Sequence, residues 1–282
     1  MTAADFASGK GHRDENFPVA SWLVRRDLRA PILAFYRFAR AADDVADHPQ
    51  AGERQKLDQL ARMEAALRGD AGANEEGAAL REVLQQRGVT DQHALDLLEA
   101  FRRDVTKRRY ADWPELMDYC RYSAAPVGRM VLDLHGEPTT LWPANDALCT
   151  ALQVINHLQD CAKDYRALDR VYVPLDALAA EGETVEALSA AQASPGLRRT
   201  IEALANRTGS LLEQSRAFAG GIADRRLALE VGVIQALAED LVVRLTRRDP
   251  LSERVHHRPV EAVGLSLRGA LGVMIGWIGG HG

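Results

Sequence analysis

Apolar side chains recur every three to four residues along almost the whole chain, which is the period of an amphipathic α-helix. The segment ILAFYRFARAADDVADH, opened by Pro31 and closed by Pro49, predicts one such helix. The same pattern predicts further helices over 53–68, 78–87, 91–109, 114–136, 143–165, 175–190, 197–218, 222–247 and 258–278. Alternating strand patterns and fixed-period repeats are missing from the sequence. We therefore expect an all-α fold.

Proline and linker positions refine this prediction. Pro126 lies inside the helix that Pro114 opens, and because proline has no amide donor we expect a kink there. No stretch rich in Pro, Gly and Ser separates two halves of the chain. The sequence therefore predicts a single domain over residues 1–282.

The composition excludes several classes of protein. With 46% hydrophobic and 27% charged residues, the 282-residue chain is neither disordered nor fibrous. A net charge of −5 gives no overall basic field, so we expect no nucleic-acid partner. Three cysteines are an odd number and argue against a disulfide framework. The N-terminus shows no apolar signal region, so a cytoplasmic location is expected.

The most apolar segment, 262–280, is broken by Arg268 and rich in glycine. It falls short of a membrane-spanning run. We favour a core helix for it, and peripheral contact with the inner face of the membrane is the alternative.

Two DxxxD pairs are the first candidates for chemistry: Asp43 with Asp47, and Asp160 with Asp164. In a helix this spacing puts both carboxylates on one face. Magnesium prefers oxygen ligands and takes one or two protein carboxylates together with substrate phosphates. The spacing alone is weak support, because aspartate is common in this chain.

The surroundings of the pairs carry more information. Gln153, Asn156, Asp160 and Asp164 form one polar stripe among apolar neighbours. Buried carboxylates are costly, so such a stripe is hydrated, salt-bridged or metal-bound. From the residues alone, a metal site and a solvated face both remain open.

Arginines supply the complementary charge. Arg40 shares a helix face with Asp43, and Arg37 lies one turn earlier, so either could pair with a diphosphate or form a surface salt bridge. The basic run 102–109 is interpreted first as a solvated helix end. His157 has no His or Cys partner at metal spacing, which disfavours zinc and makes a structural role the default. Motifs of serine hydrolases, P-loop NTPases and dinucleotide-binding enzymes are absent.

Three segments together resemble the squalene/phytoene synthase family of head-to-head prenyl synthases. They are ARAADDVAD (39–47), YCRYSAAPVG (119–128) and QVINHLQDCAKDYRALDRVYVP (153–174). Their order and spacing match over most of the chain. Within the family, ENFPVAS (15–21) together with the first and third segments looks most like the hydroxysqualene synthase branch of the hopanoid pathway.

The resemblance implies an isoprenoid-synthase helical bundle around a central cavity, in which the aspartate pairs face one another and bind Mg²⁺–diphosphate. It implies that presqualene diphosphate is ionised, rearranged and quenched by water to hydroxysqualene, without a reductant. Partner enzymes of squalene and hopanoid synthesis would supply the substrate and use the product. The residues it assigns to substrate are Arg40, Val127, Gly128, Gln153 and Asn156, with Tyr119 and Tyr172 near the reacting end. Asn16 and Phe17 match positions near the diphosphate end in the family. Arg37 and His157 are additional candidates suggested by this sequence itself.

The chain departs from the pattern of many relatives at three places. Asn16 stands where many relatives have Ser, and Asp169 stands where they have Gly. His157 replaces an apolar residue, which suggests that it positions the quenching water. Alternatives within the family are a presqualene diphosphate synthase and a squalene or phytoene synthase. An alternative of another class is a non-catalytic helical scaffold that binds lipid.

Overall fold

The computed structural model describes residues 25–279, and helices make up nearly all of its regular structure. Within these residues the only β-type pairing is an isolated parallel bridge between Arg109 and Val171. The prediction of an all-α fold is confirmed. In chain order the α-helices are α1 (Arg26–Asp47), α2 (Glu53–Arg68), α3 (Glu75–Arg87), α4 (Gln92–Thr106), α5 (Trp113–Ser123), α6 (Ala125–His135), α7 (Trp142–Leu168), α8 (Leu175–Ala180), α9 (Pro195–Ser215), α10 (Phe218–Gly221), α11 (Arg225–Arg247) and α12 (Pro259–Gly279). Two short 3₁₀ helices are η2 (Thr139–Leu141) and η3 (Val185–Ser189).

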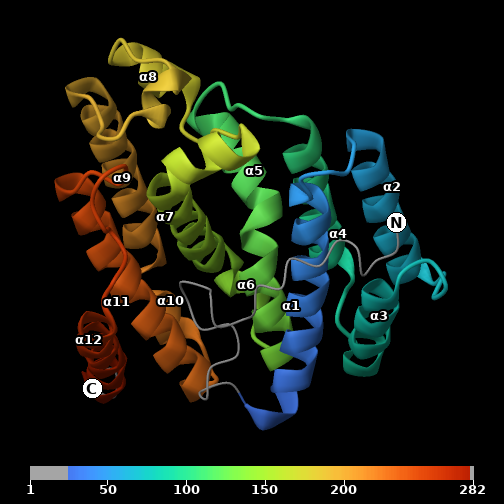
Figure 1. Ribbon diagram of the computed structural model, residues 1–282. Coiled ribbons are helices and arrows are strands. Elements are labelled where there is room, and N and C mark those ends of the chain that lie inside the picture. Colours follow the sequence, from blue (N-terminus) through green and yellow to red (C-terminus); the bar gives the residue numbers. More distant parts are fainter. Residues whose placement is uncertain (1–24, 280–282) are drawn as a thin grey trace. The chain divides into compact units, whose positions relative to one another are not determined.

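The chain divides into two compact units that interleave along the sequence. The first unit contains the chain up to Lys107 and takes in Pro126–Pro138, and the second contains Arg108–Ala125 and everything from Thr139 onward. Helices α1 to α4 and most of α6 therefore belong to the first unit (Figure 1). The single domain predicted from the sequence stays a prediction.

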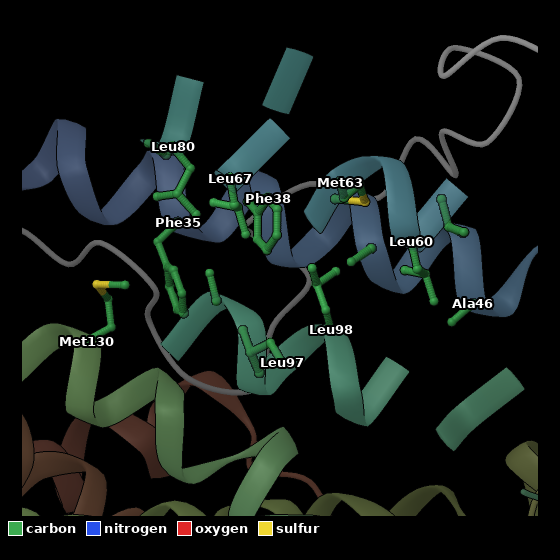
Figure 2. Packing of buried hydrophobic residues seen from close by; sticks show 14 of the residues in the cluster. Phe35, Phe38, Ala46, Leu60, Met63, Leu67, Leu80, Leu97, Leu98 and Met130 are labelled. Carbon is green, nitrogen blue, oxygen red and sulfur yellow. The ribbon is translucent and has the colours of Figure 1, made fainter. Parts of the chain in front are cut away.

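The core of the first unit lies where α1 packs on α2, α3 and α4. Phe38, Leu60 and Leu98 are completely buried there, and Met130 joins the same cluster from α6 (Figure 2). Each helix contributes the apolar stripe that its sequence period predicts. Burying these stripes against one another removes their surface from water, which is the main force that holds the four helices together.

The second unit is organised around α7, α9 and α11, each of which packs on the other two (Figure 1). Helix α5 packs on α7, and α12 lies along α11. The buried side chains include Ile155 and Leu158 of α7, with Leu204 of α9 and Leu241 of α11. This packing fixes the long helix α7, which carries the polar stripe predicted from the sequence.

Two prolines were expected to affect helices, and only one of them lies at a helix boundary. Pro31 was expected to open its helix, but that expectation is wrong, because α1 begins at Arg26 and contains Pro31. The carbonyl of Asp27, which an amide at position 31 would have bonded, instead accepts a hydrogen bond from Arg87 at 2.5 Å. The disturbance expected at Pro126 is present and is stronger than a kink, since α5 ends at Ser123 and α6 begins at Ala125, so the helix predicted over 114–136 is two helices.

Several other boundaries differ from the sequence pattern, and the helix predicted over 175–190 is divided into α8 and η3. Helix α3 starts at Glu75, three residues before the predicted range, because the side chain of Asn74 accepts a hydrogen bond from the Gly77 amide at 2.8 Å and caps the helix. Helix α4 ends at Thr106 instead of continuing through Arg109, whose backbone pairs with Val171.

The last helix contradicts the expectation of a core helix for the segment 262–280. Only 6% of its apolar window, Pro259–Ile278, is buried. By length and composition alone, α12 qualifies as a helix that could cross a membrane. Periodicity predicted the helix but did not show that much of its apolar surface stays exposed.

Candidate functional site

The carboxylates of the first DxxxD pair lie on α1 around one guanidinium group. Arg40 forms ion pairs with Asp43 and with Asp44, each at 3.0 Å, and Asp47 lies one turn after Asp43. All three aspartates are half-buried. Arg40 thus pairs with two of the three aspartates, and on this part of α1 carboxylates are in excess over guanidinium groups.

Electrostatics at Asp43 reflect that excess. The pKa of Asp43 is raised to about 7, first because the protein surrounds its carboxyl group and then because of the charge on Asp47. The buried carboxylate of Asp104, from α4, and that of Asp44 raise this pKa further, while Arg40 opposes them. A divalent cation would relieve this repulsion.

The second DxxxD pair lies on α7. The helix is continuous from Trp142 to Leu168, so Gln153, Asn156, Asp160 and Asp164 follow one another along one face at half-buried positions. Asp160 has Lys163 as an ion-pair neighbour at 3.6 Å. The stripe predicted from the sequence is therefore present in the second unit.

Aromatic rings gather beside this stripe. The ring of His157 stacks on that of Tyr172, with 3.5 Å between centroids and 13° between planes. The ring of Tyr119 lies next to both of these rings. The ring of Tyr110 stacks on that of Tyr172, with 5.5 Å between their centroids. The hydroxyl groups of Tyr119 and Tyr172 are 3.4 Å apart. All four side chains are buried, so the three residues expected at the reacting end do lie together.

Burial keeps His157 neutral. The pKa of its imidazole is lowered to about 3, mainly by burial and in addition by the positive charge of Arg170. The amide of Gln153 donates to Nε2 of His157 at 3.1 Å, which leaves the ring proton on Nδ1. Arg170, also buried, donates to the Tyr172 hydroxyl at 3.4 Å. Gln153 and Arg170 thereby fix the orientation of the His157–Tyr172 stack.

Comparison with known protein families identifies the family of this chain. The squalene/phytoene synthase family model matches residues 11–261. The chain belongs to the squalene/phytoene synthase family.

Several relatives within this enzyme family match most of the chain. A hydroxysqualene synthase from Zymomonas mobilis is 54% identical over 96% of this chain and 92% of its own. Another from Rhodopseudomonas palustris is 55% identical over 93% of this chain and 90% of its own. A phytoene synthase from Thermus thermophilus is 30% identical, over 85% and 82% of the two chains.

Solved structures agree with the fold. The squalene synthase HpnC from Alicyclobacillus acidocaldarius has a TM-score of 0.74 and 34% identity, covering 87% of this chain and 92% of that one. A dehydrosqualene synthase in complex with a ligand has a TM-score of 0.75 over 93% and 92% of the chains, at 24% identity. The isoprenoid-synthase helical fold expected from the motifs is confirmed, and the scaffold alternative loses its support because the synthase belongs to a family of enzymes.

The aspartates suit magnesium by their chemistry. Among residues 25–279, no three His, Cys, Asp or Glu side chains converge closely enough to hold a metal ion by themselves. Magnesium commonly relies on one or two carboxylates and completes its shell with substrate phosphates and water. A pair of neighbouring carboxylates that repel one another, such as Asp43 and Asp47, is a ligand set of that size.

Asp169, one of the departures from the family pattern noted in the sequence, occupies a left-handed backbone conformation with φ of 51°. It ends α7, and its carboxylate accepts a hydrogen bond from Arg109 at 2.5 Å. Arg109 also binds the backbone carbonyl of Asp169, and Arg108 binds that of Leu168, both at 2.5 Å. The end of the basic run 102–109, predicted to be a solvated helix end, therefore caps α7.

The remaining predicted substrate residues are more scattered. Arg37 is exposed, and its nearest ion-pair partner is Glu76 on α3 at 3.9 Å. Val127 is 43% exposed near the start of α6, with the half-buried Gly128 beside it. Asn16 and Phe17 lie outside the described residues.

Three residues that the sequence analysis did not single out belong to these clusters. Asp104 lies on the same buried face of α4 as Leu97 and Ala100. The helical spacing of these three residues could therefore have predicted a buried aspartate. Tyr110 and Arg170 come from segments outside the helices. No periodicity marks such positions, so only the fold could place them.

Proposed function

We propose that the chain is a hydroxysqualene synthase that converts presqualene diphosphate to hydroxysqualene and diphosphate. The observation that carries the proposal is 52–55% identity, over most of both chains, to three relatives of that name. The next relatives, the phytoene synthases, are 30–34% identical. The site residues support the proposal, because each carries the chemistry that the reaction needs.

The aspartates Asp43 and Asp47 of the first unit, and Asp160 and Asp164 of the second, are proposed to ligate Mg²⁺. When bound, Mg²⁺ would neutralise the charge that builds up on the leaving diphosphate. Arg40 is already oriented by Asp43 and Asp44, and its guanidinium group fits the same role by bidentate hydrogen bonds. Arg37, Gln153 and Asn156 remain proposed substrate contacts, as do Val127 and Gly128.

The first step breaks the bond between carbon and the diphosphate oxygen, and both electrons leave with diphosphate. The resulting cyclopropylcarbinyl cation rearranges to an allylic cation. Tyr119 and Tyr172 are proposed to face it, because the electron-rich faces of aromatic rings attract cations. A neutral His157 adds no repulsive charge to these rings, which its pKa of about 3 supports.

The second step forms a bond between the allylic carbon and the oxygen of one water molecule. The water then loses a proton, which we assign to the released diphosphate, the strongest base that the reaction itself generates. His157 is a poor proton acceptor, since its pKa is about 3, and it is proposed to position the water through its Nδ1–H group. No electrons are exchanged with a reductant, so the step needs no nicotinamide cofactor.

The test is product analysis of the purified protein with Mg²⁺, using presqualene diphosphate and farnesyl diphosphate in parallel. We expect hydroxysqualene from presqualene diphosphate without NADPH. Conversion of farnesyl diphosphate would instead identify a presqualene diphosphate synthase or a squalene or phytoene synthase. Absence of any product from both substrates would refute the proposal.

Variants test the metal ligands. Asp43→Asn and Asp160→Asn should each lower turnover by at least about a hundredfold, since each removes a proposed ligand of the Mg²⁺ that would neutralise the leaving diphosphate. Asp58→Asn is a matched control, because Asp58 also pairs with an arginine on its helix, Arg54, at an exposed position. Circular dichroism should show equal helicity in all of them. Equal activity of all three variants would refute the ligand assignment.

The substrate and product also define a cellular setting. Both are thirty-carbon lipids, so one enzyme must supply presqualene diphosphate and another must use hydroxysqualene. We propose that the synthase works in the cytoplasm with these partner enzymes and touches the inner face of the membrane, where its product dissolves.

A further inference from the structure

The outer face of α12 is the largest exposed apolar feature among the described residues. Seven of its large apolar side chains are 38–84% exposed: Val260, Val263, Leu267, Leu271, Met274, Ile275 and Ile278. At about 100° per residue, these positions fall within one arc of roughly 120° on the helix. Most other large apolar residues of the described chain are buried, so this concentration on one helix needs an explanation.

The opposite side of α12 is firmly packed on α11. The backbones come so close that a side chain at Gly269 would overlap the carbonyl oxygen of Gly232. Glu261 forms an ion pair with Arg244 of α11 at 3.0 Å. These contacts hold α12 along its length, so the helix cannot cross a membrane without leaving the second unit. A partner of the outer face must therefore approach from the side.

The charge pattern of the helix indicates the kind of partner. The only charged residues of α12 are Glu261, which is engaged by Arg244, and Arg268. Arg268 is exposed and lies at the edge of the apolar arc. It also lines a cavity with Glu213, Glu239 and Asp240, without an ion pair to any of these three. An apolar arc flanked by an exposed guanidinium group fits acyl chains bordered by anionic headgroups.

We propose that the outer face of α12 seats the synthase on an anionic lipid surface, with the helix axis parallel to the membrane plane. A second copy of the chain fits this face less well, since stable interfaces use about 20–30 residues per partner and the arc offers far fewer. The inference deepens the peripheral membrane contact proposed above, and it holds whichever prenyl diphosphate is converted.

Flotation of the full-length protein with vesicles tests this proposal. We expect it to float with vesicles of phosphatidylcholine and phosphatidylglycerol, and much less with phosphatidylcholine alone. The double variant Leu267→Ser, Leu271→Ser should reduce the bound fraction at least about tenfold, since each leucine loses its apolar contact with lipid. Arg268→Ala should weaken binding to the anionic vesicles about fivefold.

A matched control removes exposed apolar residues elsewhere in the second unit. Val243 and Leu175 are 44% and 37% exposed, and the double variant Val243→Ser, Leu175→Ser should float like the unchanged protein. Equal loss of flotation in both double variants would overturn the proposal, and so would failure of the unchanged protein to float. A dimer in solution that the Leu267→Ser, Leu271→Ser variant converts to monomer would assign the face to a second copy and also overturn it.

Activity separates this proposal from the proposed function. With substrate dispersed in detergent, the Leu267→Ser, Leu271→Ser variant should retain turnover, because no residue of α12 is assigned to the reaction. Flotation without hydroxysqualene formation would refute the function and keep the membrane face. Hydroxysqualene formation without flotation would refute the membrane face and keep the proposed function.

Discussion

The buried histidine of α7 should make the stability of the protein depend on pH in one direction. In the folded protein the pKa of His157 is about 3, whereas an unfolded chain has the ordinary value of about 6.5. Between these values the unfolded state binds one more proton than the folded state. Stability therefore falls as the pH drops from about 6.5 toward 3, and this contribution is fully present above 6.5.

The size of the effect follows from the two pKa values. Each pH unit in this window costs about 1.4 kcal/mol, so at pH 4.5 the loss is about 3 kcal/mol. Replacing His157 with Gln or with Phe removes the titrating group. Both variants should lose their excess dependence on pH, even if their stabilities at neutral pH differ because one keeps a polar side chain.

Urea unfolding followed by circular dichroism between pH 7.5 and 4.5 measures this difference. We expect the free energy of unfolding of the unchanged protein to fall by about 3 kcal/mol more than that of either variant over this range. If all three proteins lose stability in parallel, His157 titrates alike in the folded and unfolded states, and the argument that burial keeps it neutral is wrong.

Three further predictions test packing and backbone geometry. Gly269→Ala should lower the free energy of unfolding by about 1–3 kcal/mol, because the new methyl group would overlap the backbone of α11. Gly272→Ala, which has open space at its Cβ, should be neutral or stabilising. Thermal unfolding distinguishes the two variants. Asp169→Ala should lower the free energy of unfolding by about 1–2 kcal/mol, since alanine keeps the left-handed strain and loses the side-chain hydrogen bond from Arg109. Asp169→Gly removes the strain together with that bond, so its stability should stay within about 1 kcal/mol of the unchanged protein. Equal urea midpoints for the two variants would contradict this. Phe38→Ala should cost about 3–5 kcal/mol in urea unfolding, since its ring is completely buried, and a loss below about 1 kcal/mol would mean that the core collapses around the gap.

The sequence predicted what depends on local pattern. Helical spacing correctly placed the stripe from Gln153 to Asp164 on one face of α7, and Pro126 correctly marked a break between two helices. The motifs also identified the family, since three separate segments occurred in the expected order. In these cases, residues near one another in sequence carry the whole signal.

Prediction failed where distant residues decide the outcome. Pro31 is tolerated inside α1 because Arg87, from α3, satisfies the carbonyl that proline leaves without a partner. The buried Asp104 acts on Asp43 from another helix, and the tyrosine cluster draws Tyr110 from a loop. Periodicity shows which side of a helix is apolar, but not what covers it, and α12 was misjudged for that reason.

The interleaving of the two units sets an order for protein synthesis. Helices α1 to α4 leave the ribosome first, but their core also includes Met130, which follows eighteen residues of the second unit, 108–125. The first unit therefore cannot complete its packing until the chain has been made through Pro138. Meanwhile α5 has emerged and must wait for α7, its packing partner. A fragment that stops at Lys107 would expose apolar surface, so neither unit can be produced intact as one uninterrupted piece of the chain.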